Sequence, residues 1–511
     1  MKGHKGFRCW LFAALLPLLA VLQACPPVDD EEAEKIAADP DYKAKVFLRQ
    51  EYMDKIYYWG EEVKDRNASF KPYDYEIYDF FDALLDSRDR WSWMCDKEYY
   101  VSSETGVYNG TWGVSLTQPD DVFDDFGIYV RYLYPGSPFE PFGVTRGAVI
   151  THINGFDVSD NPATGRFTQE KLDYFNANYD KSPQTFTFRL ADGRDTTFTT
   201  AKAASLATRP GLITRVFQPG DFPGLTEPVG YFHYLSFLVN FLDDIDNTMK
   251  TFHDAGVKKV IVDLRYNGGG DSRASQRLID YLAPKSAEGQ PYVIRHHNNY
   301  LRSQSDAYSD ENNTYYVISS IPPEDKDQKA VWNKVYPNRL DLDGLYFITG
   351  HGSASASEMV MNGLRPYLGD KLQMVGDTTY GKPNGMYVLI YPGSDDDYDR
   401  FDADDYSTLQ WVFLPICFFN MNSKLEAIPD KGFIPNNTRP DDIFHDFGVN
   451  EDLIKACLTR IATGSYPAVT AVKARANTKA PARKGARMQR EADAPGYGRY
   501  VVLRRDISDI N

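Results

Sequence analysis

The chain has 511 residues, of which 42% are hydrophobic and 14% aromatic, and its formal net charge at pH 7 is −16. This apolar content supplies several packed cores and excludes a mainly disordered protein. The negative charge argues against nonspecific nucleic-acid binding, because it repels phosphates. The five cysteines and eight histidines show no CxxC or HExxH spacing, so we expect no metal centre.

The N-terminus has the form of a targeting signal. Residues 1–24 begin with basic residues and continue in an apolar run that is too short to span a bilayer comfortably. The run ends in the letters LQAC, which resemble the lipobox of bacterial lipoproteins. This resemblance implies that Cys25 is lipidated and becomes the first mature residue, with residues 25–32 as an acidic tether. An ordinary secretory signal peptide is the alternative.

The rest of the chain divides into four parts by its residue pattern. In residues 33–110, apolar residues recur every three or four positions, which predicts a helical domain. Residues 111–203 group β-forming residues between Pro and Gly turns, which is typical of a mainly β domain. Residues 204–464 alternate apolar strands with amphipathic helices, which predicts an α/β core. Residues 465–511 are basic and poor in apolar residues, as expected of a flexible tail.

The β-rich part contains the segment FGIYVRYLYPGSPFEPFGVTRGAVITHING (126–155), which resembles a PDZ domain. A PDZ domain adds a peptide strand to its sheet edge and binds the terminal carboxylate through backbone N–H groups. The resemblance implies that these donors surround Gly127 and Ile128. One departure is Ala148, at a position where such domains usually carry Asp.

A serine-rich loop lies between two predicted elements of the α/β part. The apolar run LYFIT predicts a buried strand, and GHGSASASEMV (350–360) follows it directly. A strand, a small-residue loop and a helix present a serine hydroxyl at a helix N-terminus, where backbone N–H groups stabilise an oxyanion. Ser353, Ser355 and Ser357 all fit, and residue chemistry alone does not separate them. Lys382 follows a second apolar strand and suggests a lysine base instead of histidine.

Three segments follow the PDZ-like part in a fixed order, namely VDLRYNGGG, GHGSASASEMV and GDTTYGKPNG. In this order they resemble the carboxyl-terminal processing (tail-specific) serine peptidases, whose core has a crotonase- or ClpP-like α/β fold. The aromatic, helical N-terminal part resembles the lipoprotein branch of this family in Bacteroidetes-type bacteria. That resemblance implies a lipid-anchored protein in the cell envelope of a Gram-negative bacterium, on the periplasmic or surface side of the outer membrane.

The resemblance also assigns the two groups that carry the reaction. Ser355 is implied as the nucleophile, with Ser353 and Ser357 as the near alternatives. Lys382 is implied as the general base, which must be neutral to accept the serine proton. We therefore expect burial to lower its pKa well below the ordinary value of about 10.4.

Two backbone N–H groups are implied as oxyanion donors, those of Ala356 and Gly269, with Gly268 and Gly270 as alternatives to Gly269. No cofactor is implied. The expected function is a serine endopeptidase that cleaves proteins or peptides with accessible C-termini, selected through the PDZ domain. The alternative is a catalytically inactive, PDZ-bearing lipoprotein that binds peptides. The intact set of serine, lysine and glycine residues argues against that alternative.

Overall fold

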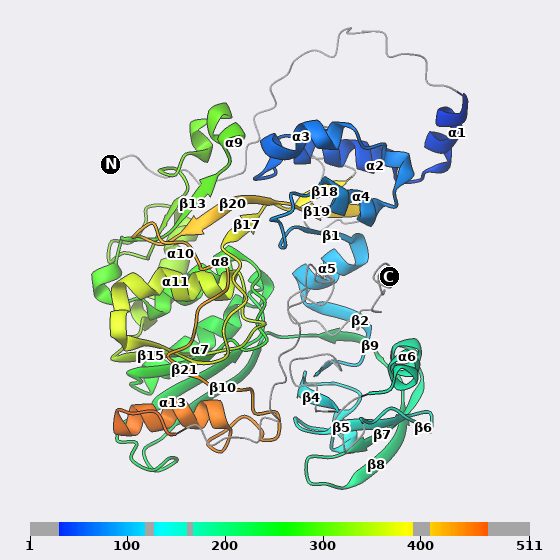
Figure 1. Cartoon of the computed structure of the whole chain (residues 1–511). Helices are drawn as coiled ribbons and strands as arrows, with labels where there is room; N and C mark the ends of the chain where they lie inside the picture. The colour runs from blue at the N-terminus through cyan, green and yellow to red at the C-terminus, as the bar shows by residue number, and fades with distance from the viewer. Residues whose placement is uncertain (1–29, 118–126, 161–166, 392–408, 469–511) are drawn as a thin grey trace.

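The computed structural model describes residues 30–117, 127–160, 167–391 and 409–468. They form a large α/β unit, a smaller β module beside it and a layer of helices from the N-terminal part (Figure 1). The signal segment, Cys25 and the chain beyond residue 468 lie outside the described residues, so the expectations for them stay predictions. Among the described residues, no helix has the length and apolar character needed to cross a membrane.

A six-stranded sheet forms the centre of the α/β unit, with the strand order β10-β11-β12-β15-β16-β21. Neighbours from β11 to β21 run parallel, whereas β10 at the edge is antiparallel to β11. The inner strands are continuous apolar runs because both faces of the sheet are covered. The strands are β10 (Gly211–Phe217), β11 (Val229–Tyr234), β12 (Lys259–Asp263), β15 (Gly344–Thr349), β16 (Leu372–Gly376) and β21 (Asn437–Thr438).

Helices cover both faces of this sheet. Successive residues of a strand point to opposite faces, so Val260 and Val262 of β12 pack with α7, α8 and α11, whereas Ile261 packs with α13. Figure 1 shows α13 on the side of the sheet opposite to α8 and α11. The helices are α7 (Leu242–Asp254), α8 (Ser272–Leu282), α11 (Ala356–Leu368) and α13 (Asp452–Thr463). This arrangement confirms the predicted α/β core.

The three loops that carry the predicted site residues meet at one edge of the sheet. β12, β15 and β16 are adjacent and parallel, so their carboxyl ends lie side by side. The chain leaves β12 into the glycine loop (266–270), leaves β15 into the serine loop (350–355) and leaves β16 into the lysine loop (377–383). The fold therefore brings together three segments that are far apart in the sequence.

A four-stranded antiparallel sheet packs against α11 and continues the lysine loop. Its strand order is β14-β13-β20-β17, and Gly363 of α11 lies against Tyr292 of β13. Two further helices, α9 (Asn299–Gln304) and α10 (Lys326–Val335), follow β13 in the chain. The strands are β13 (Pro291–His297), β14 (Thr314–Tyr316), β17 (Asn384–Met386) and β20 (Ile416–Met421).

The β module (residues 112–202) is mainly β, as its composition predicts. It is carried by a two-stranded ribbon of β2 (Val107–Thr111) and β9 (Ala203–Ala207). Its sheet has the order β3-β4-β5-β7-β8, with β6 paired to β5. The elements are β3 (Val114–Leu116), β4 (Ile128–Leu133), β5 (Val149–Ile153), β6 (Phe156–Asp157), α6 (Gln169–Asn178), β7 (Gln184–Arg189) and β8 (Asp195–Thr200).

The sheet of the β module corrects one expectation about its open edge. β4 pairs with β3 on one edge and with β5 on the other, and the carbonyl of Gly127 accepts a hydrogen bond from Thr117 Oγ1 (3.0 Å). Gly127 and Ile128 therefore do not lie at an open sheet edge, contrary to the sequence-based expectation. Among the described residues, the sheet ends at β3 on one side and at β8 on the other, and β3 covers β4.

The N-terminal helices share a core with the α/β unit. Phe81 stacks on Phe413, with ring centroids 6.3 Å apart, and the same cluster contains Ala354 and Tyr380 from the loops at the sheet edge. β1 (Trp93–Asp96) also joins a small sheet with β19 (Trp411–Leu414) and β18 (Leu389–Tyr391). The expected helices are present, but they do not form a separate domain. They are α1 (Asp30–Ala38), α2 (Tyr42–Phe47), the π-helix η1 (Leu48–Met53), α3 (Gly60–Ala68), α4 (Ile77–Leu84) and α5 (Lys97–Thr105).

Candidate active site

The three serines of the serine loop differ in their surroundings. Ser353 and Ser357 are fully buried. Ser353 Oγ donates to the Leu264 carbonyl (2.8 Å), and Ser357 Oγ donates to the Asn267 carbonyl (2.8 Å). These two hydroxyls tie the serine loop to the end of β12 and to the glycine loop. Ser355, between them, is partly exposed.

Ser355 occupies an unusual backbone conformation at the start of α11. Its φ is 53° and its ψ is −112°, a region that residues with a Cβ rarely adopt. Such a conformation costs about 1–3 kcal/mol and persists where the surrounding structure fixes it. Ala356 is the first residue of α11, so its N–H has no acceptor within the helix. This N–H is therefore available to an oxyanion formed beside Ser355.

The glycine loop packs directly on Ser355. A Cβ atom built on Gly269 would lie 2.8 Å from Ser355 Cβ and 3.0 Å from Ala356 N. Gly269 also has a φ of 112°, which residues with a side chain rarely adopt. Only glycine fits this position, because backbone must approach the serine closely.

The expected role of Gly269 as an oxyanion donor is not supported by its hydrogen bonding. Its N–H donates to Asn267 Oδ1 (2.9 Å), and Asn267 Nδ2 donates to the Tyr234 carbonyl (2.8 Å), which fixes the orientation of that amide. Of the three glycines that the sequence suggests for this role, Gly268 and Gly270 remain as alternatives to Gly269.

Lys382 is partly buried at the end of the lysine loop, and its Nζ lies 3.7 Å from Met386 Sδ. The backbone just before it is held by the N-terminal layer. The Gly381 carbonyl accepts hydrogen bonds from Arg90 Nη2 (2.8 Å) and Trp91 Nε1 (3.0 Å). Arg90 and Trp91 thereby fix the position from which the lysine side chain starts.

One buried carboxylate joins the serine loop to the lysine loop. Glu358 is fully buried in the first turn of α11. Its Oε2 accepts from the backbone N–H groups of Ser355 (3.0 Å) and Lys382 (2.8 Å). Its Oε1 accepts from the Gly381 N–H (2.7 Å) and the Thr379 hydroxyl (2.6 Å). Burial raises the pKa of the Glu358 carboxyl above its ordinary value, and the four hydrogen bonds oppose that rise.

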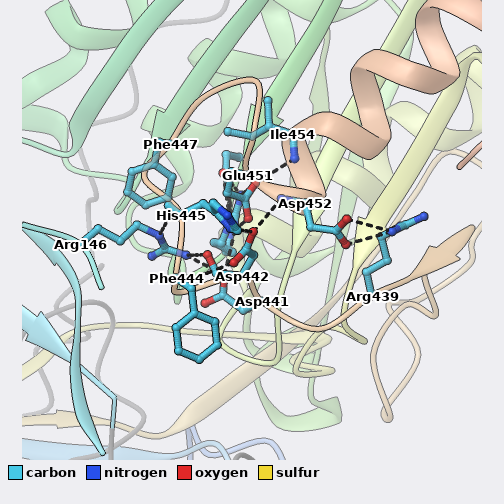
Figure 2. Close-up of polar contacts among 12 residues, drawn as sticks. Arg146, Arg439, Asp441, Asp442, Phe444, His445, Phe447, Glu451, Asp452 and Ile454 are labelled. Carbon is cyan, nitrogen blue, oxygen red and sulfur yellow. Dashed lines mark hydrogen bonds and ion pairs between the residues drawn. The ribbon is translucent and has the colours of Figure 1, made fainter. Parts of the chain in front are cut away.

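A buried arginine links the β module to the glycine loop. Arg146 lies against segment 441–447 of the α/β unit (Figure 2) and is only 3% exposed. Its guanidinium donates to Asp441 Oδ1 (2.9 Å) and to the Tyr266 hydroxyl (3.0 Å). Because Tyr266 is the first residue of the glycine loop, the β module is in contact with the loop that surrounds the serine.

A second buried arginine extends this network. Arg265 forms ion pairs with Asp263 (2.8 Å), Asp441 (2.8 Å) and Glu451 (2.6 Å). Glu451 also caps the N-terminus of α13. Burial raises the pKa of the Asp441 carboxyl, but Arg146 and Arg265 outweigh it and hold that pKa well below its ordinary value. The network fixes the end of β12, where the glycine loop begins.

Three residues that contact the site loops, Glu358, Arg90 and Arg146, were not among the predicted site residues. The letters from Ser355 to Glu358 did carry a signal, because S-x-x-E is a capping-box pattern. That pattern indicates only a helix start, not a contact with the lysine loop. Arg90 and Arg146 carried no signal, since arginines are common on protein surfaces.

The remaining candidates for chemistry do not form a further site. Within residues 30–117, 127–160, 167–391 and 409–468, Cys95, Cys417 and Cys457 are buried free thiols. In the same residues no group of His, Cys, Asp and Glu side chains is placed to hold a metal ion.

A strained turn that exposes one serine at a helix N-terminus, beside a glycine loop and a lysine, defines a serine-hydrolase type of site. The model of peptidase family S41 matches residues 228–398, which contain all three loops. Residues 228–398 are thus similar to peptidase family S41, and the protein is a serine-type peptidase.

One solved structure with a TM-score above 0.5 shares this fold. A protein from Bacteroides fragilis NCTC 9343, assigned as an S41 protease, is 19% identical with a TM-score of 0.56, and the match covers 82% of this chain and 97% of that chain. The photosystem II D1 C-terminal processing protease is a more distant match, 15% identical with a TM-score of 0.42, covering 78% and 93% of the two chains. The comparison with curated proteins found no match.

We expect Glu358→Gln to lower kcat/KM roughly ten- to a hundredfold. The amide would place hydrogens against N–H groups that now donate to a carboxylate, and a buried unpaired donor costs about 1–3 kcal/mol. The acid side of the wild-type pH–rate profile should also steepen at a pH above the ordinary glutamate pKa, because burial raises the pKa of Glu358. Glu358→Gln should lack this steepening, and Glu311→Gln, at an exposed position, should keep it.

Protonation of Glu358, which should lower the activity, should have the opposite effect on the stability of the fold. A folded-state pKa above the unfolded one means that the contribution of Glu358 to the free energy of unfolding is greatest below its unfolded pKa. That contribution is lost as the pH rises through the folded-state pKa. In the acid range where protonation of Glu358 lowers the activity, thermal unfolding should therefore show no loss of stability from this group. Identical pH profiles for wild type and Glu358→Gln would contradict the positioning role.

Proposed function

We propose that Ser355 is the nucleophile of this peptidase and that Lys382 is its general base. The observation that carries the proposal is the difference among the three serines. The hydroxyls of Ser353 and Ser357 are buried and donate to backbone carbonyls, whereas Ser355 is partly exposed on a strained turn. A nucleophile must reach a substrate, and a buried structural hydroxyl does not.

The reaction follows from the chemistry of these groups. The neutral Lys382 amine accepts the proton of the Ser355 hydroxyl while Oγ attacks the carbonyl carbon of the scissile peptide bond. The carbonyl oxygen becomes an oxyanion that accepts hydrogen bonds from the Ala356 N–H and from a donor of the glycine loop. Lys382 then gives the proton to the leaving amine, and an acyl-enzyme ester remains. Lys382 next takes a proton from water while the water oxygen attacks the ester carbonyl carbon. The bond to Ser355 Oγ then breaks, Lys382 returns the proton to Oγ, and the acid leaves.

The relation between the two loops supports this pairing. The backbone N–H groups of Ser355 and Lys382 donate to the same oxygen of Glu358, so the two loops keep a fixed register. The lysine side chain is partly buried and lies against Met386, whose thioether is uncharged. Burial favours the neutral form of an amine.

We also propose that the β module is a PDZ-like domain that selects substrates by their C-termini. The support is the open edge of β3, to which a peptide strand can add. Gly113, just before β3, has a φ of 60°. The neighbouring Trp112 indole donates to the Tyr179 carbonyl (2.9 Å), which brings the start of β3 beside the end of α6. A strand edge next to a helix end is the arrangement that such recognition needs.

The sequence of the N-terminus supports a proposal about location. We propose that Cys25 is lipidated and anchors the peptidase to the outer membrane of a Gram-negative cell envelope, on its periplasmic or surface side. The letters LQAC before and at Cys25 carry this proposal. The partners would then be proteins or peptides of that compartment with accessible C-termini.

Ser355→Ala and Lys382→Arg should each lower peptide hydrolysis by roughly a thousandfold or more, because members of one catalytic unit fail together. The guanidinium of Lys382→Arg is not deprotonated in this pH range. Wild-type activity should rise with pH as the amine loses its proton. Hydrolysis of a fluorogenic peptide and labelling by a fluorophosphonate measure both variants, with the exposed Ser303→Ala as the control. An active Lys382→Arg enzyme would remove lysine from the role of base.

Amidating the C-terminus of a peptide substrate should weaken its binding by about 1.5–3 kcal/mol, the range for hydrogen bonds to charged groups. Calorimetric titration of matched acid and amide peptides onto Ser355→Ala protein measures the difference without cleavage. Equal affinities would mean that the β module recognises something other than a chain end.

Cys25→Ala should move the protein from the membrane fraction to the soluble fraction of the cell envelope. A lipid chain is the only anchor that the proposal includes, so nothing else should retain the variant. Fractionation together with metabolic labelling by a fatty-acid analogue tests this. Equal labelling of wild type and Cys25→Ala would contradict the proposal that Cys25 is lipidated.

A further inference from the structure

Arg295 projects from the small sheet beside the active-site loops. It lies on β13 directly opposite Asn420 of β20, and opposite residues of an antiparallel pair share a face. Its guanidinium carbon is 4.7 Å from the ring centroid of Phe418 and 4.5 Å from that of Tyr315. Nη1 donates to the Tyr315 hydroxyl (2.9 Å), and Nη2 donates to Ser272 Oγ (2.9 Å). Two aromatic rings and two hydroxyls thus hold the guanidinium in place.

These contacts put Arg295 near the glycine loop. Ser272 is the first residue of α8 and lies three positions after Gly269. Three residues span at most about 11 Å. Gly269 itself is so close to Ser355 that an added Cβ would meet the serine Cβ at 2.8 Å. The guanidinium is therefore bound to a residue three positions from the glycine that packs on Ser355.

The same arginine is also next to the lysine loop. A Cβ built on Gly385 would lie 2.1 Å from the ring of Phe418, on which Arg295 stacks. The Asn420 N–H donates to the Pro383 carbonyl (2.8 Å), directly after Lys382. Arg295 thus contacts Ser272, just after the glycine loop, and β20, whose Asn420 binds the end of the lysine loop.

Arg295 differs from other arginines of this core, because their charge is neutralised by an ion pair with a carboxylate. Arg277, Arg339 and Arg439 each form an ion pair with a carboxylate, with Asp246 (2.9 Å), Glu288 (2.5 Å) and Asp452 (2.9 Å) respectively. In the part of the chain that the structure describes, Arg295 has no such carboxylate. Its Nε is buried without a hydrogen-bond partner, and so is Oδ1 of the opposite residue, Asn420.

A guanidinium has five N–H groups, so Nη1 and Nη2 each keep one beyond those given to Tyr315 and Ser272. A guanidinium is suited to a carboxylate, which matches its planar set of donors. We propose that Arg295 is a specificity-determining residue that binds a substrate carboxylate within two residues of the scissile bond. The inference rests on the proposed nucleophile, Ser355, because it takes the position of the scissile bond from that residue.

Two sources of this carboxylate are distinguishable. One is the side chain of Asp or Glu in the substrate, and the other is the α-carboxylate of a substrate that ends just after the scissile bond. The first series of peptides has amidated C-termini and carries Glu or Gln at each of the two positions on either side of the bond. The second series has no acidic side chain and ends one or two residues after the bond, as the acid or the amide.

Wild-type enzyme should cleave the better carboxylate peptide roughly tenfold faster in kcat/KM, or more, than its neutral partner, the range for a charge-assisted hydrogen bond. Arg295→Met should bring that ratio close to one. Arg302→Met makes the same substitution at an exposed arginine of the following helix and should keep the wild-type ratio. Arg295→Gln retains donors for Tyr315 and Ser272 without the charge, and it replaces Arg295→Met if that variant does not fold.

A preference confined to the first series assigns the side-chain source, and one confined to the second series assigns the terminal carboxylate. Either preference supports a carboxylate subsite if it disappears in the Arg295 variant. No preference in wild type, or a preference that survives the loss of Arg295, overturns the proposal. Ser355→Ala is assayed in parallel. If it still cleaves these peptides, the proposed nucleophile is wrong, whereas an inactive Ser355→Ala with no carboxylate preference in wild type overturns only the role of Arg295.

Discussion

The geometry of the site depends on the carboxylate of Glu358. It is buried, and it accepts one hydrogen bond from the serine loop and three from the lysine loop. The two loops leave different strands, and one backbone hydrogen bond, from the Tyr380 N–H to the Ser353 carbonyl (3.0 Å), links them directly. Glu358 adds a single oxygen that accepts from the backbone of both Ser355 and Lys382. The strained conformation of Ser355 can persist because this bond and the packing of Gly269 fix the turn.

The three loops are also held from outside the α/β unit. Arg90 and Trp91 of the N-terminal layer bind the backbone before Lys382, and Arg146 of the β module binds Tyr266 at the start of the glycine loop. Each outer part therefore contacts a different loop of the peptidase. This arrangement explains why the N-terminal helices share a core with the α/β unit, since their apolar face closes over the same loops.

The buried arginines of this acidic protein differ in whether a carboxylate neutralises their charge. Around Arg146 and Arg265, buried arginines are matched with buried carboxylates, and the result is a rigid seam between the module and the core. Breaking one partner of such a network leaves an uncompensated buried charge. Arg295 lacks this match among the described residues, although it is held as firmly by its neighbours. A held but unmatched guanidinium is suited to recognition, whereas a matched one is suited to structure.

The sequence by itself determined the α/β core, the order of the three loops and the residue types that they carry. These follow from apolar runs, glycines and small residues, which are local properties of the chain. The different surroundings of Ser353, Ser355 and Ser357 were decided by the tertiary structure, because only folding buries two of the hydroxyls against carbonyls of distant segments. The same reason applies to Gly269, whose N–H is taken up by Asn267, and to β4, whose edge is covered by β3. The contacts of Glu358 and Arg295 are with residues far away in the chain, so they form only when the strands of the sheet come together.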